Sequence, residues 1–322
     1  MLIAPLVLGI LCLAYAIPET FAQDYPNRPI RMVVPTTPGG SADILGRLIA
    51  QKLHERLGQP VVVENRGGAG QMIGSDHVAK SSADGYTLLL VTVSYTTSTA
   101  TYPKLPFDPV NDLTGIAMVG MGPLMLTVHP SLPVKTVKEL IAFAGARPGK
   151  LNYASSGSGG ISHLMTEMFA ARARISIVHV PYKGIAAAVT NTVGGHVGML
   201  FASMPAAAPQ VKANRLRALA VSTATRSPFM PELPSIAEAG VPGYDAGTWW
   251  GVLAQAKTPR NLVARLNGEI NKILAAEDVK ARLAAEGAEP VPGISAEKFS
   301  AMLKTEIANW SKIVKDLNIK IE

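Results

Sequence analysis

Residues 30–41 read Ile-Arg-Met-Val-Val-Pro-Thr-Thr-Pro-Gly-Gly-Ser, and they join three different local patterns. The apolar run 30–34 predicts a buried β-strand, and the prolines and glycines that follow predict a loop. Ser41 is a favourable helix N-cap, and apolar residues recur at helical spacing from there to Leu57. The stretch therefore predicts a strand–loop–helix unit, the building block of an α/β protein.

The same alternation continues along the chain, and a second strand–loop–helix unit covers residues 151–172 with its own glycine-rich loop at 155–160. The further strands that we expect lie at 61–63, 86–93, 175–180, 197–202 and 216–221, and the further helices at 71–81, at 186–193 and over most of the chain after 260. This order favours a mainly parallel, doubly wound sheet. Two similar units more than a hundred residues apart indicate two similar lobes.

Length and composition fit such a protein. The chain has 322 residues, 48% of them hydrophobic, which is enough to bury the core of one two-lobed protein or of two domains. The net charge is +7, but Lys and Arg are scattered among acids without interleaved aromatics. This pattern argues against nucleic-acid binding and favours a mild attraction of anions.

Residues 1–22 are interpreted as a secretory signal peptide. The segment is apolar to residue 16 and ends in Thr20-Phe21-Ala22, with a small residue at the expected cut, although no Lys or Arg precedes the apolar run. A membrane anchor is the alternative, but the run is short for a span. The only cysteine, Cys12, lies in this segment, so the mature chain would have no disulfide.

The two glycine-rich loops are the strongest candidates for a binding site. Each precedes a helix, and a helix N-terminus carries free N–H groups and a partial positive charge. Glycines let the backbone approach a ligand closely, so such a loop suits an anion. Neither loop has the phosphate-loop or dinucleotide glycine pattern, so no nucleotide cofactor is expected. The alternative for either loop is an ordinary turn between a strand and a helix.

Two other kinds of site, a hydrolase site and a metal site, have weaker support in the sequence. Ser156 or Ser158 with His163 could form a nucleophile–base pair of a hydrolase, but no nucleophile elbow and no orienting acid accompany them. The six histidines are far apart, so no metal site is predicted. Tyr182 and Lys183 could reach a cleft as a wall and an anion partner, or could lie in solvent at a helix start.

Trp249 and Trp250 stand on one predicted strand, so their side chains should point to opposite faces. We expect both to lie in the core, although one could line a cleft or a hinge.

The sequence motifs together resemble the Bug-type solute-binding proteins of tripartite tricarboxylate transporters, over the whole mature chain and in order. The matching stretches are YP at 25–26, PI at 29–30, VP at 34–35, PGGSAD at 38–43, QPVVVENR at 59–66, DGYT at 84–87, LPFDP at 105–109, NYASSG at 152–157, SHL at 162–164, VPYKG at 180–184, PS at 234–235, EAG at 238–240 and KTP at 257–259.

The resemblance implies an α/β fold of the type II periplasmic binding proteins, with two doubly wound lobes, a central ligand cleft and two crossovers between the lobes. Residues 24–124 and 246–322 would form lobe 1, and residues 125–245 would form lobe 2. The ligand-binding residues implied are Thr36, Thr37, Gly39, Gly40, Ser41, Asp43, Ser94, Tyr95, Ser155, Ser156, Gly157, Ser158, Gly159, His163, Tyr182, Lys183, Gly184, Ala202 and Ser203. Ser94 and Tyr95 stand in the predicted loop after Val93, and for Asp43 a helix-capping role is the alternative.

The resemblance also implies a function, a location and partners. We expect a periplasmic, monomeric receptor, not an enzyme, that binds a di- or tricarboxylate or an aromatic carboxylate, needs no cofactor or metal, and delivers its ligand to the membrane permease subunits of a tripartite transporter. The alternatives are a ligand-sensing receptor for a sensor kinase ectodomain and a secreted interaction module without a ligand.

Two positions depart from the family pattern. Thr36 replaces a usual aromatic residue, which predicts a wider or more polar pocket. The stretch 198–203, which includes Ala202, lacks an acid that the family often has there. Because that acid could pair with an amino group, its loss argues against an amino-acid ligand.

Overall fold

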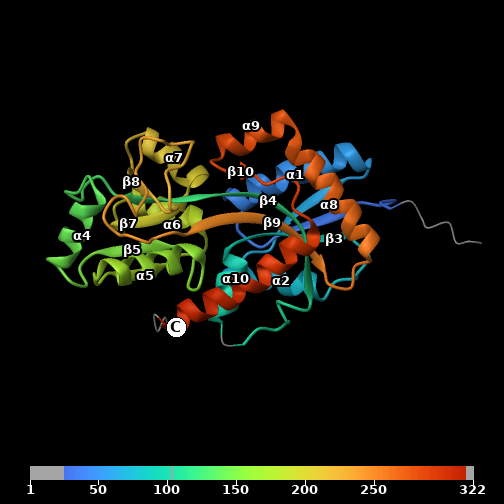
Figure 1. Cartoon of the computed structure of the whole chain (residues 1–322), viewed down its shortest axis with the longest axis horizontal. Helices are drawn as coiled ribbons and strands as arrows, with labels where there is room; N and C mark the ends of the chain where they lie inside the picture. The colour runs from blue at the N-terminus through green and yellow to red at the C-terminus, as the bar shows by residue number, and fades with distance from the viewer. Residues whose placement is uncertain (1–24, 103, 317–322) are drawn as a thin grey trace, which may run out of the picture.

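A computed structural model of the chain describes residues 25–102 and 104–316. The molecule is elongated, with two lobes that lie side by side and are joined by two long strands (Figure 1). The predicted signal peptide lies outside the described residues. Among the residues that are described, no helix is long and apolar enough to cross a membrane.

Lobe 1 contains the first half of the sheet. Its strands are β1 (Ile30–Val34), β2 (Val61–Asn65), β3 (Thr87–Thr92), β9 (Gly247–Gln255), the first part of β4 (Leu113–Val128) and the short β10 (Glu289–Pro290). Strand β1 lies between β2 and β3 and is parallel to both, while β9 is antiparallel to β3 and to β4. Its helices are α1 (Ser41–Leu57), α2 (Met72–Ala79), α3 (Ser94–Thr101), α8 (Arg260–Ala275), α9 (Glu277–Ala285) and α10 (Ala296–Asp316), with a 3₁₀ turn at Ala69–Gln71.

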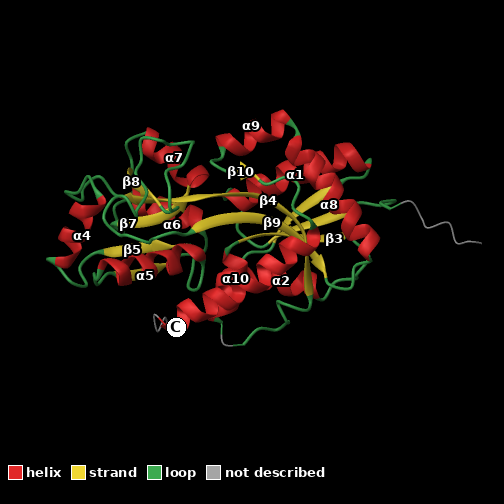
Figure 2. Cartoon of the chain, viewed as in Figure 1, coloured by secondary structure: helices red, strands yellow, loops and turns green. Residues whose placement is uncertain are grey.

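Lobe 2 is built on the second part of β4. Its other strands are β5 (Asn152–Ser155), β6 (Val178–Pro181), β7 (Met199–Ser203) and β8 (Arg217–Val221). Strands β5, β6 and β7 are mutually parallel, whereas β7 and β8 run antiparallel to β4. Helices α4 (Val137–Gly145), α5 (Ile161–Ala173), α6 (Ile185–Val193) and α7 (Met204–Lys212) pack around this half of the sheet (Figure 2).

The two lobes share β4, and the chain passes between them there and at β9. Strand β4 pairs with β9 as far as Pro123 and Gly247, and from Leu124 onward it pairs with β7. The two crossovers expected from the resemblance are therefore these two strands. The prediction of a mainly parallel sheet was wrong at this point, because both crossover strands are antiparallel to their neighbours.

The region after Val93 was predicted as a loop and is instead helix α3. The run Ser94-Tyr95-Thr96-Thr97 has no amphipathic helical pattern, which is why the sequence did not signal a helix. The helix is buried at its start, and its hydroxyls bond to backbone carbonyls, as Thr96 does to Val93 and Thr99 to Tyr95. A helix of this kind depends on its tertiary surroundings.

Both tryptophans of β9 are in the core, as predicted. Trp249 and Trp250 are 4% and 1% exposed and point to opposite faces of the strand. Trp249 packs edge-on against Phe299 of α10, with ring centroids 5.6 Å apart. A Cβ atom at Gly251 would overlap the Phe299 ring, so glycine at this position lets α10 lie directly on β9.

Candidate functional site

A cavity of about 710 Å³ lies between the lobes. Both lobes contribute to it: Pro35, Thr36, Thr37, Pro38, Gly40, Ser41, Ala42, Asn65, Gly67, Gly68, Ala69, Gly70, Gln71, Thr92, Ser94, Tyr102 and Thr248 come from lobe 1, and Leu124, Ser156, Gly157, Ser158, Gly160, Ile161, Ser162, Tyr182, Lys183, Gly184, Ile185 and Ser203 come from lobe 2 or its border with lobe 1. Among these described residues Lys183 carries the only charge, and none is an acid.

Helices from both lobes begin at this cavity. The first residues of α1, α3, α5 and α6 are Ser41, Ser94, Ile161 and Ile185, and all four line it. Because the N-terminal turn of a helix presents N–H groups and a partial positive charge, their convergence makes the cavity electropositive. Its chemistry therefore suits an anion.

Asp43 shapes the first loop from behind. Its side chain is buried and accepts hydrogen bonds from the Gly39 amide at 3.0 Å, from Asn65 Nδ2 at 3.0 Å and from Arg47 Nε at 3.2 Å. Burial alone raises the pKa of Asp43, but the hydrogen bonds from Arg47, Gly39 and Asn65 outweigh it and hold the pKa below its usual value. The charged carboxylate thus fixes Gly39 and does not line the cavity.

The serine–glycine loop of lobe 2 is held in a similar way. The Ser162 hydroxyl accepts a hydrogen bond from the Ser156 amide at 2.8 Å, and His163 Nδ1 accepts one from the Gly159 amide at 3.0 Å. Gly157 has φ +134°, a value that glycine tolerates and other residues rarely adopt. This arrangement turns Ser156, Gly157 and Ser158 toward the cavity.

Two hydroxyls at the cavity have no partner. Thr36 Oγ1 and Ser203 Oγ are buried, lie on opposite lobes, and make no hydrogen bond to any described residue. A buried hydroxyl without a partner carries a free-energy cost, and here both of these hydroxyls belong to residues of the cavity lining.

The lobes touch each other beside the cavity. Ser94 Oγ of lobe 1 accepts a hydrogen bond from the Ile161 amide of lobe 2 at 3.2 Å. A Cβ atom at Gly184, whose φ is +103°, would lie 2.8 Å from Thr37 Oγ1. The lobes are therefore closed on each other in this structure, and the loop that carries Thr37 meets the loop that carries Gly184.

The implied binding residues divide into two groups. Those that line the cavity are Thr36, Thr37, Gly40, Ser41, Ser94, Ser156, Gly157, Ser158, Tyr182, Lys183, Gly184 and Ser203. Those that do not line it are Gly39, Asp43, Tyr95, Ser155, Gly159, His163 and Ala202. Tyr95 is fully buried and donates its hydroxyl to the Pro109 carbonyl at 2.6 Å, so it supports α3 and not a ligand.

Several lining residues were not anticipated from the sequence. The largest group is the run 67–71, whose backbone is glycine-rich like the two loops that were singled out. This glycine-rich composition is the feature of the sequence from which these lining residues could have been predicted. Gln71 in this run binds Thr92 through its side chain, with Nε2 donating to Oγ1 at 2.6 Å.

The serine–histidine pairs do not form a hydrolase site. His163 Nδ1 is occupied by the Gly159 amide, and its ring is stacked on His179 behind the loop. The Ser155 hydroxyl bonds to His179 Nε2 at 2.6 Å, but Ser155 is fully buried and does not reach the cavity. In the described residues no cluster of His, Cys, Asp or Glu could hold a metal ion.

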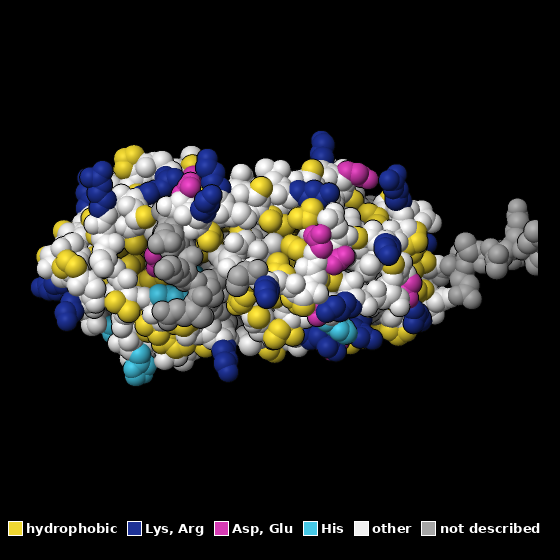
Figure 3. Space-filling view, turned by 90° about the horizontal axis from the view of Figure 1, so that it is seen from below, with side chains coloured by type: hydrophobic (Ala, Val, Ile, Leu, Met, Phe, Trp, Pro, Cys, Tyr) yellow, Lys and Arg dark blue, Asp and Glu magenta, His cyan; other side chains and the backbone are white. Residues whose placement is uncertain are grey.

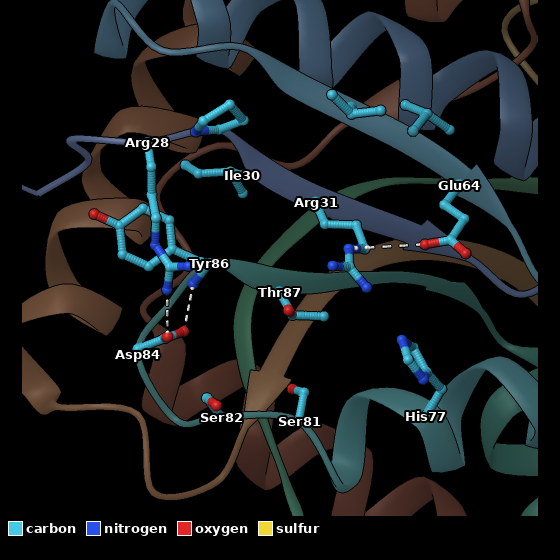
Figure 4. A pocket seen from close by; sticks show the side chains of 13 residues that line it. Arg28, Ile30, Arg31, Glu64, His77, Ser81, Ser82, Asp84, Tyr86 and Thr87 are labelled. Carbon is cyan, nitrogen blue, oxygen red and sulfur yellow. Dashed lines mark hydrogen bonds and ion pairs between the residues drawn. The ribbon is translucent and has the colours of Figure 1, made fainter.

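A second hollow of about 620 Å³ lies on lobe 1 and shares no lining residue with the cavity (Figure 4). Its charged side chains pair with one another, Arg28 with Asp84 at 2.8 Å and Arg31 with Glu64 at 3.8 Å. Lys and Arg side chains are also dispersed over the face shown in Figure 3, without one basic patch. Neither surface rivals the interlobe cavity as a site for an anion.

Fold and site together define a two-lobed α/β protein with a cavity between its lobes whose lining suits an anion, the architecture of solute-binding proteins. The model of the tripartite tricarboxylate transporter family receptors, TctC, matches residues 45–319, so the chain belongs to this family.

Individual proteins and solved structures are also similar to this chain along most of its length. BugT of Bordetella pertussis is 39% identical over 303 residues, which cover 94% of this chain and 93% of BugT. The solved structure of R. palustris Rpa4515 with adipate is 39% identical, covers 92% of this chain and 99% of its own, and superposes with a TM-score of 0.89. The periplasmic binding protein BugD is 30% identical over 92% of this chain and 100% of its own, with a TM-score of 0.87.

Proposed function

We propose that this protein is a periplasmic receptor that captures a small carboxylate between its two lobes and delivers it to a tripartite transporter. The observation that carries the proposal is the convergence of the N-termini of α1, α3, α5 and α6 on one cavity that no described acid lines. Fixed, uncharged N–H groups can hold a carboxylate through charge-assisted hydrogen bonds without a paired cation, which permits release without any chemical change.

The ligand is proposed to carry two carboxylates and no amino group. Donors from both lobes face the cavity, so an anionic group can be held at each side. An ammonium group would find no acid among the described lining residues. Adipate, the ligand of the similar Rpa4515 structure, has this chemistry.

Lobe closure is the proposed signal to the partner. A ligand that contacts both lobes binds the closed form better than the open one and shifts the population toward it. The permease subunits of a tripartite transporter would then recognise the closed form. Location in the periplasm follows from the predicted signal peptide and agrees with BugD, a periplasmic binding protein.

A thermal-shift and calorimetry panel tests this proposal. The probes are adipate, phthalate, citrate and glutamate, and each bound ligand is recovered and checked for chemical change. A ligand at about 100 times its Kd stabilises the native state by about 2.7 kcal/mol, which gives a clear rise in melting temperature. No rise with any carboxylate, or a ligand converted to a product, overturns the proposal. Glutamate as the tightest ligand overturns the statement about the amino group.

A further inference from the structure

Two histidines of lobe 2 lie stacked behind the ligand-facing loop 155–160. The rings of His163 on α5 and His179 on β6 are 4.0 Å apart at their centroids and 8° from parallel. The Tyr153 ring of β5 lies nearly parallel beside both, with its centroid 4.9 Å from that of His179 and 6.4 Å from that of His163. His163 is 4% exposed, so its imidazole belongs to the interior of the lobe.

Each imidazole bonds to the loop. His163 Nδ1 accepts the N–H of Gly159 at 3.0 Å. His179 Nε2 is 2.6 Å from Ser155 Oγ, and that oxygen accepts the N–H of Gly157 at 3.2 Å. The pair therefore determines where two amides of the loop point, and the residues between and beside them, Ser156 and Ser158, line the cavity.

These contacts define the protonation state. A nitrogen that accepts an N–H must be unprotonated, so His163 carries its proton on Nε2. A second proton on Nδ1 would place two donors against each other at Gly159 and would put two stacked rings in repulsion if both were charged. The loop shape seen here requires His163 to be neutral.

We propose that His163 and His179 are positioning residues, a neutral stacked pair that fixes the loop 155–160 in its ligand-binding shape and releases it when acid protonates the pair. The inference rests on the proposed function for its link to affinity, while the link between the pair and the loop is independent of any ligand. Protonation of the pair would then weaken carboxylate binding at acidic pH.

The surroundings agree with a neutral pair. Burial lowers the pKa of His163 to about 3, with the His179 ring as a second cause, and burial lowers the pKa of His179 to about 4. The titratable side chain beside both rings is Tyr153 on β5, and its hydroxyl is bonded in turn to Glu167 on α5, with Tyr153 Oη donating to Glu167 Oε1 at 2.5 Å. Because both histidine pKa values lie below 6.5, folding favours the neutral rings, and this stabilisation is lost as the pH falls from about 6.5 through the folded pKa values of about 4 and about 3.

Two variants distinguish the hydrogen-bond acceptor at position 163 from the bulk of the imidazole ring. In His163→Asn the amide oxygen can take the place of Nδ1, whereas His163→Leu keeps a similar volume and removes the acceptor. With adipate as the probe at pH 7.5, we expect calorimetry to give a Kd at least tenfold higher for His163→Leu and within threefold of wild type for His163→Asn. Equal affinity of His163→Leu and wild type overturns the proposal.

The pH profile tests the acid step. The double variant His163→Asn/His179→Gln keeps the hydrogen bonds without a titratable ring. Protonation of adipate itself affects both proteins equally, so the ratio of their Kd values isolates the histidines. We expect the wild-type Kd to rise at least threefold more than that of the double variant between pH 7.5 and pH 3.5, because the pKa values of the two rings are about 3 and about 4. Parallel profiles overturn the acid step.

A ligand-free measurement distinguishes this inference from the proposed function. Imidazole ¹⁵N spectra should show His163 protonated on Nε2 alone and not titrating between pH 7.5 and pH 5.5. Hydrogen exchange of the Gly159 amide should be slow in wild type and in His163→Asn and fast in His163→Leu. If these hold while no carboxylate binds, the proposed function fails and the positioning role stands. Titration of His163 near pH 6.5, or a proton on Nδ1, overturns the inference even if adipate binds.

Discussion

Replacing Ser94 by Ala should weaken ligand binding by removing one hydrogen bond between the lobes. Ser94 Oγ accepts the Ile161 amide at 3.2 Å, and Ile161 is only 7% exposed in the closed form. Without the hydroxyl this N–H is buried without a partner when the lobes close, but it can reach water when they open. An unsatisfied buried donor costs about 1–3 kcal/mol of free energy. We expect the lower part of this range, about 1–2 kcal/mol, because the first four N–H groups of a helix have no partner within the helix in any case.

The closed form carries that cost, so the Kd for a carboxylate should rise by about 5- to 30-fold, since 1.4 kcal/mol corresponds to a factor of ten. Calorimetry measures the change in Kd, and small-angle X-ray scattering with saturating ligand measures closure. Ser98→Ala is the matched control. Ser98 stands one turn along the same helix, and its buried hydroxyl has no hydrogen-bond partner in the described structure, so its loss should leave the Kd unchanged.

A second background isolates the hydrogen bond from direct ligand contacts of Ser94. Ile161→Pro removes the donor itself, and proline is tolerated at the first position of a helix. The preceding residue, Gly160, already has φ −70° and ψ 163°, which suit a residue before proline. In the Ile161→Pro protein Ser94→Ala should change the Kd less than threefold. A full 5- to 30-fold loss in that background, or no loss in the wild-type background, would refute the role of this hydrogen bond.

Lys183→Met should raise the Kd for a dicarboxylate about three- to tenfold at low salt and by less at 0.5 M salt, because salt screens the charge of the exposed ammonium group. Calorimetry at the two salt concentrations measures both Kd values, and an equal loss of affinity at both would contradict this prediction. Burial raises the pKa of Glu306 despite hydrogen bonds from Thr96 and Trp249, so its ionisation destabilises the fold as the pH rises above about 4.5. Glu306→Gln should therefore melt about 2 °C above wild type at pH 7.5, with the gap closing toward pH 4 in calorimetric scans; a constant gap would argue against the buried charge. Asp43→Asn should cost about 1–3 kcal/mol at pH 7 because Gly39 loses a charged acceptor. Since the Asp43 pKa is lowered, that difference should shrink as the pH falls from about 5 to 3 in urea titrations, and a pH-independent difference would contradict it.

The local elements could be predicted from residue patterns. The strand–loop–helix unit that begins at Ile30 and the corresponding unit at Asn152 both formed, and both loops reached the cavity. Hydrophobic period, N-caps and glycines act over a few residues, so they can be read without knowledge of the rest of the chain. Twelve of the nineteen binding residues implied by the family resemblance line the cavity, and seven of the twelve stand in these two units: Thr36, Thr37, Gly40, Ser41, Ser156, Gly157 and Ser158.

The remaining site could not be predicted in this way. Asp43 and His163 have side chains typical of a binding site, yet both hold backbone amides of the loops from behind. Which side of a loop faces the ligand depends on the residues that pack beneath the loop. His163 of α5 packs against the ring of His179, which comes from strand β6. Helix α3 was missed because its buried hydroxyl residues are stabilised by neighbours distant in sequence, such as Glu306.

The sequence by itself therefore determined an α/β chain with two glycine-rich loops that each open a helix and suit an anion. Only the tertiary structure decided that the two loops share one cavity. That outcome depends on β4 and β9, which cross between the lobes, and on the contact between Ser94 and Ile161, which closes them. Pairing of residues this far apart leaves no local pattern, because its free energy comes from burial and hydrogen bonds that exist only once the chain is folded.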